Sequence, residues 1–383
     1  MRPERVLVPV MRQVLARPRL ADALFRFDPW GNPFSEESLA NPLRMAEQIR
    51  GGDPVTWKRQ YQQWIVIGYD EAREVLGSPS VGTANQVEVI LDVSPYRKMA
   101  ARTRSVLENI MLVTDPPRHT RLRGLVNRAF TPKRVAGIDE RMIALADQYV
   151  AELPTDEFDL MESIAHRFPV AVIGELFGFP IEEQEWLHQR SAIVSRLFDA
   201  LLGFDADQMD QAIDELYDRI VDLAAERRAD PRDDLITGLA LAEAEDGDRL
   251  SEEELVSVAI FILLAGHETT AAMIGNSILA LHNHPDQRAL IDARPELWPN
   301  AVSELLRFDT SVVADPRTAL EDFELAGHRI KKGQNIAVLP WWVNRDLRHW
   351  PDADELRLDR DNPDPLSFGH GVHYCLGANL AKA

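Results

Sequence analysis

The chain contains a single cysteine, Cys375, whose surroundings suit a reactive sulfur. Gly369, Gly371 and Gly377 lie close to it, and glycine lets the backbone adopt positive φ and lets another group approach closely. Residues 378–381 read as the first turn of a helix. Because a helix N-terminus favours negative charge, this position predicts a thiolate rather than a thiol.

A lone sulfur in a glycine-rich loop is compatible with three roles. It can be a buried cysteine that behaves as a small hydrophobic residue, a nucleophile partnered by a base, or a ligand of a metal. Zinc is disfavoured because its structural sites need several Cys or His ligands at short spacing, and the chain has no second cysteine. Haem iron needs only one protein ligand, and cysteine thiolate is one that it accepts.

The residues around this cysteine resemble the haem-binding loop of the cytochromes P450. The pattern Phe-x-x-Gly-x-x-x-Cys-x-Gly is filled by Phe368, Gly371, Cys375 and Gly377. The resemblance covers nearly the whole chain and is strongest to the bacterial, soluble members. It implies a mainly α fold with small β-sheets, the triangular prism of that family, formed by residues 1–383 as one domain. It also implies haem b as the cofactor, with Cys375 as the axial ligand of the iron.

Four further positions are implied as contacts of the haem propionates. Asp115-Pro116-Pro117 predicts a helix that ends by Thr131, since proline is favoured in a first turn. His119 and Arg123 are four residues apart and therefore share a face of that helix. Without the resemblance, this cluster reads as a solvated basic face. With it, His119, Arg123, Arg317 and His373 are expected to contact the propionates.

A long central helix is predicted from the capping box Ser251-x-x-Glu254 to about Asn283. Residues 258–266 are apolar on all faces, as in a helix that crosses the centre of a protein. Residues 265–270 resemble the oxygen-activation motif of the family, which implies a local bulge in the helix and a space above the iron left by Ala265 and Gly266. Glu268 is expected to relay protons and Thr269 to hydrogen-bond dioxygen, whereas His267 is expected to be an outward-facing structural residue rather than a ligand.

The resemblance also implies a substrate pocket and a structural ion pair. An apolar pocket is expected from Phe261, Leu264, Ala265, Val312 and Val313. Glu304 and Arg307 match the core ion pair of the family. Where relatives place a third, basic member, the chain has Asp354-Glu355-Leu356, so either Arg357 or Arg360 is the expected substitute.

Composition restricts the partners of the protein. The 383 residues include 42 basic and 62 acidic side chains, and the net charge of −20 argues against nucleic acid and anionic membranes. One cysteine excludes an internal disulfide and fits a reducing compartment. The apolar run 6–11 is short and interrupted by Pro9, so no membrane anchor is expected. We therefore expect a cytoplasmic monomer. Compared with the family, the chain is short at its C-terminus, because it ends at Ala383 within the helix after Cys375.

Other elements follow from periodicity and from turn residues. Extended structure is expected at 57–67, a strand at 158–161 and a hairpin at 323–338. Residues 78–113 lack a clear period and are expected to be a variable lid. Helices are expected at 42–50, 70–76, 135–152, 169–177, 181–202, 206–228 and 298–308.

These features imply a haem-thiolate monooxygenase that inserts one oxygen atom from O₂ into a small hydrophobic substrate. Electrons would come from a ferredoxin or flavodoxin-type donor. A local basic patch is expected to steer that donor, and it consists of Arg118, Arg121, Arg128, Lys133 and Arg134. The alternatives are oxidative coupling, peroxygenase activity, or a haem-thiolate binding or sensor protein without turnover.

Overall fold

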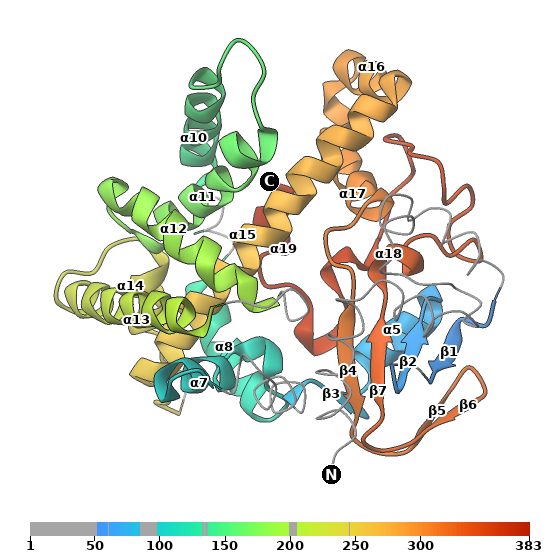
Figure 1. Ribbon diagram of the computed structural model, residues 1–383, viewed down its shortest axis with the longest axis horizontal. Helices are drawn as coiled ribbons and strands as arrows, with labels where there is room; N and C mark the ends of the chain where they lie inside the picture. Colours follow the sequence, from blue (N-terminus) through green and yellow to red (C-terminus); the bar gives the residue numbers. More distant parts are fainter. Residues whose placement is uncertain are drawn as a thin grey trace.

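The computed structural model describes residues 52–59, 61–84, 98–131, 134, 137–198, 205–244 and 246–383. Two parts of different character lie on either side of one long helix (Figure 1). On one side gather most of the helices, and on the other lie the strands with two short helices. The expected mainly α fold with small β-sheets is confirmed. The helix expected at 42–50 lies outside the described residues.

The helix-rich part is built around a single apolar cluster. Its members come mainly from the segments that run from Met99 to Leu264. The helices of this part are α7 (Ala101–Glu108), α8 (Arg118–Ala129), α10 (Asp139–Ala151), α11 (Arg167–Phe177), α12 (Gln184–Ser195), α13 (Ala206–Ala229) and α14 (Leu235–Ala240). Short turns of 3₁₀ or π helix join them at Met111–Val113, Met161–Ala165, Ile181–Glu183 and Arg196–Phe198.

The long helix is α15 (Glu252–Asn283), and it begins at the predicted capping box. The Ser251 hydroxyl accepts a hydrogen bond from the Glu254 N–H at 3.1 Å, and the Glu254 carboxylate accepts one from the Ser251 N–H at 3.0 Å. Its 32 residues extend about 48 Å. The helix is long and apolar enough to cross a membrane, but 61% of its apolar window is buried inside the protein, as in a core helix.

Three helices continue the chain beyond α15. They are α16 (Pro285–Ala293), a 3₁₀ turn at Pro295–Leu297, and α17 (Trp298–Phe308). Together with the end of α15 they enclose a small cluster that includes Ile291, Leu305 and Leu358. The predicted bounds of α17 are confirmed.

The strand-rich part contains a five-stranded sheet in the order β1-β2-β7-β4-β3. β1 and β2 form an antiparallel hairpin, β2 pairs in parallel with β7, and β4 pairs antiparallel with both β7 and β3. A separate antiparallel pair is formed by β5 (Phe323–Leu325) and β6 (His328–Ile330). The five strands are β1 (Val55–Lys58), β2 (Gln63–Val66), β3 (Val81–Gly82), β4 (Asp315–Ala319) and β7 (Asn335–Val338). Helices α5 (Tyr69–Gly77) and α18 (Pro340–Val343) complete this part.

Several sequence predictions are wrong in detail. Residues 158–161 form no strand; the chain enters the π turn Met161–Ala165 instead. α7 lies within the region expected to be a lid, and α14 was not anticipated. The hairpin expected over 323–338 ends at Ile330, because β7 pairs with β2 and β4.

Candidate active site

The cysteine lies in a loop between two 3₁₀ turns, Leu366–Phe368 and Gly371–His373, and helix α19 (Ala378–Lys382). The Cys375 N–H donates to the Phe368 carbonyl oxygen at 3.0 Å and closes this loop. Gly371 has φ +73°, and a Cβ there would lie 2.3 Å from the Leu76 carbonyl oxygen. This turn therefore requires glycine both for its φ value and for its contact with α5.

The electrostatics of Cys375 differ from the sequence prediction. Burial raises the pKa of the thiol above its usual value, whereas a hydrogen bond from the Gly377 backbone and the charge of Arg123 lower it. The raising effect dominates, so the protein's own groups favour the thiol, contrary to the expectation of a thiolate at the helix N-terminus. α19 has only five residues, and its end does not offset burial. A cation bound at the sulfur would lower the pKa of the thiol and favour the thiolate.

Three basic side chains face the same region from α8 and from the cysteine loop. His119 is 2% exposed, and its ring lies 4.2 Å from the ring of His373, measured between centroids. Within the described residues, both ring nitrogens of His119 and Nε2 of His373 are buried and have no hydrogen-bond partner. Arg123 lies near enough to Cys375 for each to shift the pKa of the other.

Burial sets the charge of these groups. It lowers the pKa of His119, with Arg123 adding to the effect and Asp115 opposing it. Burial, together mainly with His119 and Arg317, lowers the pKa of His373 to about 4. Burial also lowers the pKa of Arg123. In all three groups burial disfavours the charged form, and nearby carboxylates such as Asp115 do not offset it.

Arg317 approaches the same group from β4 but is already paired. Its guanidinium is 3% exposed and donates to the Asp315 carboxylate and, at 2.9 Å, to the Pro316 carbonyl oxygen. Its charge contributes to the low pKa of His373, so the two side chains are neighbours. Arg317 therefore adds positive potential at the edge of the group formed by His119, Arg123 and His373.

The residues present fit haem. Haem offers iron to a cysteine sulfur and carries two carboxylates, which are the acceptors that buried, unpartnered imidazoles and a guanidinium lack. The half-buried Phe368 and Gly377 lie on either side of the cysteine along the chain. A Cβ at Gly377 would meet no atom of the described chain within 4 Å, so one side of the cysteine loop is open at this position.

Helix α15 carries the residues expected to handle oxygen. The Thr269 side chain is exposed, and its hydroxyl donates to the Ala265 carbonyl oxygen at 2.6 Å. The helix is continuous from Glu252 to Asn283, so the expected bulge is absent. A Cβ at Gly266 would lie 2.6 Å from the Ile173 side chain, so glycine at this position permits close packing of α11 on α15.

Glu268 lies beside two histidines. One carboxylate oxygen of Glu268 and one ring nitrogen each of His166 and His267 lie within 4.8 Å of one another. His267 is fully buried, and its Nδ1 is 2.8 Å from the Ser191 hydroxyl on α12. The expectation that His267 faces outward is therefore wrong. Sequence spacing gave no sign of Ser191, because α12 is distant from α15 in the chain.

The five residues expected to line the substrate pocket have different surroundings. Leu264 is 2% exposed and belongs to the main apolar cluster, while Phe261 is half-buried and packs against that cluster. Ala265 and Val312 are half-buried, and Val313 is 67% exposed. Four of the five residues therefore retain accessible surface, whereas Leu264 is part of the apolar core.

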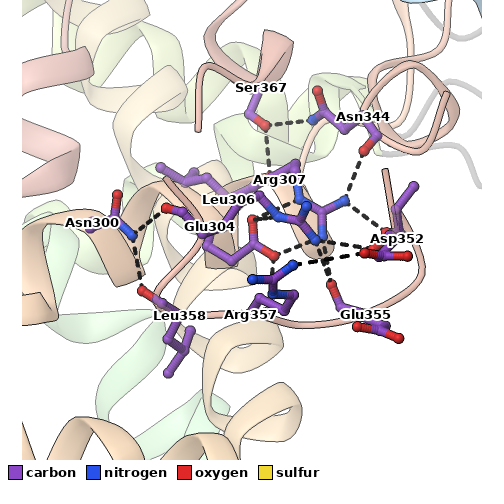
Figure 2. A network of polar contacts seen from close by, with 12 residues as sticks. Asn300, Glu304, Leu306, Arg307, Asn344, Asp352, Glu355, Arg357, Leu358 and Ser367 are labelled. Carbon is purple, nitrogen blue, oxygen red and sulfur yellow. Dashed lines mark hydrogen bonds and ion pairs between the residues drawn. The ribbon is translucent and has the colours of Figure 1, made fainter. Parts of the chain in front are cut away.

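The expected ion pair is the centre of a buried polar network (Figure 2). The Glu304 carboxylate accepts from Arg307 Nε at 2.7 Å and from Arg307 Nη2 at 2.8 Å, and both side chains are fully buried. Arg360 Nε donates to the same carboxylate at 3.0 Å, and the Arg357 backbone N–H donates to it at 3.0 Å. Arg360 is therefore the third member of the network, and Arg357 contacts Glu304 only through its backbone while its guanidinium lies 3.8 Å from the Asp352 carboxylate.

The network continues to the cysteine loop through two residues that sequence reasoning missed. Arg307 Nη1 donates to the Asn344 carbonyl oxygen at 3.0 Å. The Asn344 amide donates to the Ser367 hydroxyl at 2.9 Å, and that hydroxyl donates to the Leu306 carbonyl oxygen at 2.7 Å (Figure 2). The sequence feature that could have identified Ser367 was its position directly before Phe368.

The expected basic patch is smaller than the sequence suggested. Arg121 is paired with Asp248 at 2.7 Å and with Glu254 at 2.9 Å. Arg134 bonds the Ala129 carbonyl oxygen and lies 3.5 Å from Asp233, and Lys133 lies outside the described residues. Arg118, which bonds Asn109, and Arg128 are the exposed members.

Comparisons with known proteins identify the family of the chain. The family model described as Cytochrome P450 matches residues 52–292 and 295–383. The chain is 43% identical over 353 residues to the vitamin D(3) 25-hydroxylase of Pseudonocardia autotrophica, which covers 91% of the chain and 85% of the relative. It is 35% identical over 362 residues to the mycinamicin IV hydroxylase/epoxidase of Micromonospora griseorubida, and the match covers 93% of the chain and 88% of the relative. The structure is similar to that of CYP109E1 from Bacillus megaterium in complex with testosterone, with a TM-score of 0.77, 30% identity, and 89% and 87% of the two chains covered.

Proposed function

The chain belongs to the cytochrome P450 family of haem-dependent monooxygenases, and from this premise we propose that it binds haem b and hydroxylates a hydrophobic substrate of steroid or macrolide size. The observation that carries the proposal is the set of buried, unpartnered nitrogens of His119 and His373 beside Cys375. Buried polar atoms are normally hydrogen-bonded, so three unpartnered nitrogens gathered beside one cysteine call for an explanation, which a ligand with acceptor oxygens would supply.

Each residue of this group has a distinct task. Cys375 would ligate the iron, and His119, Arg123 and His373 would donate to the propionates, with Arg317 nearby. Bound haem supplies the redox chemistry by which two electrons and two protons split O₂, so that one oxygen atom enters the substrate and the other leaves as water. Phe368 and Gly377 shape the two sides of the cysteine loop.

Glu268 and Thr269 would manage the protons. Glu268 is half-buried and acidic, so it can take up a proton from solvent and release it inward as a general acid. The Thr269 hydroxyl donates to Ala265, and its oxygen therefore remains available to accept a hydrogen bond from a proton carrier. Donation by Thr269 to dioxygen would require its hydroxyl to leave Ala265.

The substrate proposal rests on the relatives and on the half-buried residues. Relatives are named for their action on vitamin D(3) and mycinamicin IV, and a similar structure holds testosterone. These are large and mostly apolar molecules. Phe261, Ala265, Val312 and Val313 offer apolar surface that would suit such a ligand.

A ferredoxin or flavodoxin-type protein is the proposed electron donor. The exposed Arg128 and Arg118 would attract an acidic donor to a molecule of net charge −20. Reversing the charge of Arg128 should slow reduction at low salt and leave the absorption spectrum unchanged. Arg121 is a poor choice for this experiment because its charge is already used by Asp248 and Glu254. We further propose that the enzyme is a cytoplasmic monomer.

Spectroscopy tests the haem assignment. Reduced protein with carbon monoxide should give the red-shifted band of a haem thiolate, and Cys375→Ala should abolish it. An unchanged spectrum in that variant would overturn the assignment. Screening vitamin D₃, a steroid and a macrolactone for a shift of the Soret band would then identify the substrate class.

Glu268→Gln tests proton delivery and the peroxygenase alternative together. Turnover with O₂ and electron donors should fall by about 10²–10⁴ because a general acid is lost. Hydrogen peroxide already carries the electrons and protons that the O₂ reaction requires, so peroxide-driven turnover should be nearly unchanged. An equal loss with both oxidants would contradict the assigned role of Glu268. If the wild-type protein formed no product with either oxidant, the sensor alternative would be favoured.

A further inference from the structure

Helix α15 packs against α11 and α12, and Figure 1 shows these helices beside one another. A group of side chains that could hold a metal ion joins α15 to the start of α11, and His267 of this group contacts Ser191 on α12. His166 lies at the junction between the π turn and α11, whereas His267 and Glu268 are consecutive residues of α15. One ligand atom of each lies within 4.8 Å of the other two. The P450 chemistry proposed above uses Glu268 and assigns no task to either histidine.

The hydrogen bonding of His267 is that of a metal ligand. Its Nδ1 is 2.8 Å from the Ser191 hydroxyl, whereas its Nε2 is buried and has no hydrogen-bond partner within the described residues. Histidines that bind metals commonly donate the N–H of one ring nitrogen to a neighbouring oxygen, which fixes the tautomer and leaves the other nitrogen as the ligand. Donation from Nδ1 to Ser191 would give His267 this arrangement.

Two further histidines lie close to the buried ring of His267. The ring centroid of His166 is 5.6 Å from that of His267. His188, whose ring centroid lies 5.7 Å from that of His267, also has a buried unpartnered nitrogen, Nδ1.

We propose that His166, His267 and Glu268 form a binding site for a divalent transition-metal ion, with zinc as the best match. Two imidazoles and one carboxylate are a known zinc ligand set, with water in the fourth position. Tetrahedral zinc with bonds of 2.0–2.2 Å holds its ligand atoms about 3.4 Å apart. The half-buried Glu268 and His166 side chains can close the remaining distance by rotation, while His267 stays fixed by Ser191.

Zinc at this site would engage the carboxylate that we propose as the proton carrier. The metal would therefore inhibit O₂-dependent turnover without displacing haem or substrate. This consequence rests on the proposed function of Glu268, whereas the metal site itself does not.

Zinc binding to the tag-free holoprotein tests the site directly. Equilibrium dialysis followed by metal analysis should give one tightly bound equivalent in the wild type. His166→Ala and Glu268→Gln each remove a proposed ligand and should weaken binding by at least about 10–100-fold, the loss that removal of an outer hydrogen-bond partner alone produces. His282→Ala removes an exposed histidine at the far end of the same helix and should leave binding unchanged. Equal affinity in all four proteins, or no binding to the wild type, would overturn the site.

A measurement on the wild type alone avoids any dependence on the folding of variants. Zinc X-ray absorption should show only nitrogen and oxygen ligands at about 2.0–2.2 Å, with the scattering of two imidazoles. A sulfur ligand would place the metal at Cys375 and reject the proposal.

Measuring turnover with and without zinc distinguishes the proposed metal site from the proposed monooxygenase function. Zinc should lower O₂-dependent turnover in the wild type with the same half-saturation as binding, and His166→Ala should require at least tenfold more zinc. Full binding with unchanged turnover would reject the link to proton delivery. Failure of the zinc-free wild type to turn over would instead count against the proposed function.

Discussion

Two buried groups of basic residues in this protein are partnered in opposite ways. In the network around Glu304, Arg307 makes five hydrogen bonds, two of them to the carboxylate and three to backbone carbonyl oxygens. Beside Cys375, the ring nitrogens of His119 and Nε2 of His373 have no partner within the described residues. Burial is similar, but only the first group is satisfied by the protein itself.

The difference separates a structural role from a binding role. A buried arginine whose donors are all satisfied stabilises the chain around it, and here it ties α17 to the segment that leads into the cysteine loop. Buried imidazoles without acceptors destabilise the protein until a ligand supplies them. The same residue types therefore support the fold in one region and indicate a cofactor in the other.

Removing Glu304 should produce the largest loss of stability. Glu304→Ala leaves the cations of Arg307 and Arg360 buried without their carboxylate, and this should cost about 3–5 kcal/mol of unfolding free energy. Urea denaturation monitored by circular dichroism would measure it.

The matched control is an exposed ion pair. Arg288 and Asp292 on α16 are 60% and 58% exposed. Asp292→Ala should therefore change stability by no more than about 0.5 kcal/mol. Comparable losses in the two variants would show that burial does not distinguish the Glu304 network.

Replacing His119 should have opposite effects on the apoprotein and on the holoprotein. His119→Leu removes two unpartnered nitrogens, so the apoprotein should become more stable by about 1 kcal/mol. Haem should be lost about tenfold faster or more, because one donor to a carboxylate is gone. Urea denaturation of the apoprotein and transfer of haem to apomyoglobin would measure the two effects. A destabilised apoprotein would mean that His119 belongs with the structural group.

A smaller effect is expected from pH. The pKa of His373 is lowered from 6.5 to about 4, so the folded apoprotein favours the neutral imidazole. The resulting stabilisation is present above pH 6.5 and is lost as the pH falls towards 4. His119, Arg317 and Arg123 disfavour the imidazolium, and Asp115 favours it.

Urea midpoints measured across this pH range would test the expectation. The His373→Gln apoprotein should show a shallower decrease than the wild-type apoprotein. Holoprotein should also show a shallower decrease, since propionates would stabilise the imidazolium. A steeper decrease in the holoprotein would contradict the assignment of His373 to a carboxylate ligand.

Local sequence signals correctly predicted the helices that begin with proline or with a capping box. Pro116 and Pro117 marked α8, and the capping box at Ser251 marked α15. Residues 158–161 gave no strand, since the following π turn packs on α15 and the Met161 sulfur would lie 2.8 Å from a Cβ at Gly275. Such a contact depends on tertiary packing, which periodicity does not describe.

The candidate site, like the fold, was only partly predictable from the sequence. The resemblance gave the positions of Cys375, His119 and His373, and the structure brings them into one region. It did not give the raised pKa of the cysteine or the buried position of His267. Both follow from burial by segments distant in the chain.

The pairing of β2 with β7 has a consequence for biosynthesis. Gln63, near the start of the described chain, pairs with Asn335, near its end. The β1–β2 hairpin therefore emerges from the ribosome long before its partner strand and exposes an unpaired edge during that interval. Contacts of such high sequence separation form slowly. Because β7 also pairs with β4, which carries Arg317, the sheet beside the haem side cannot be completed before β7 has been synthesised. Chaperone binding to the unpaired hairpin would protect the nascent chain until then.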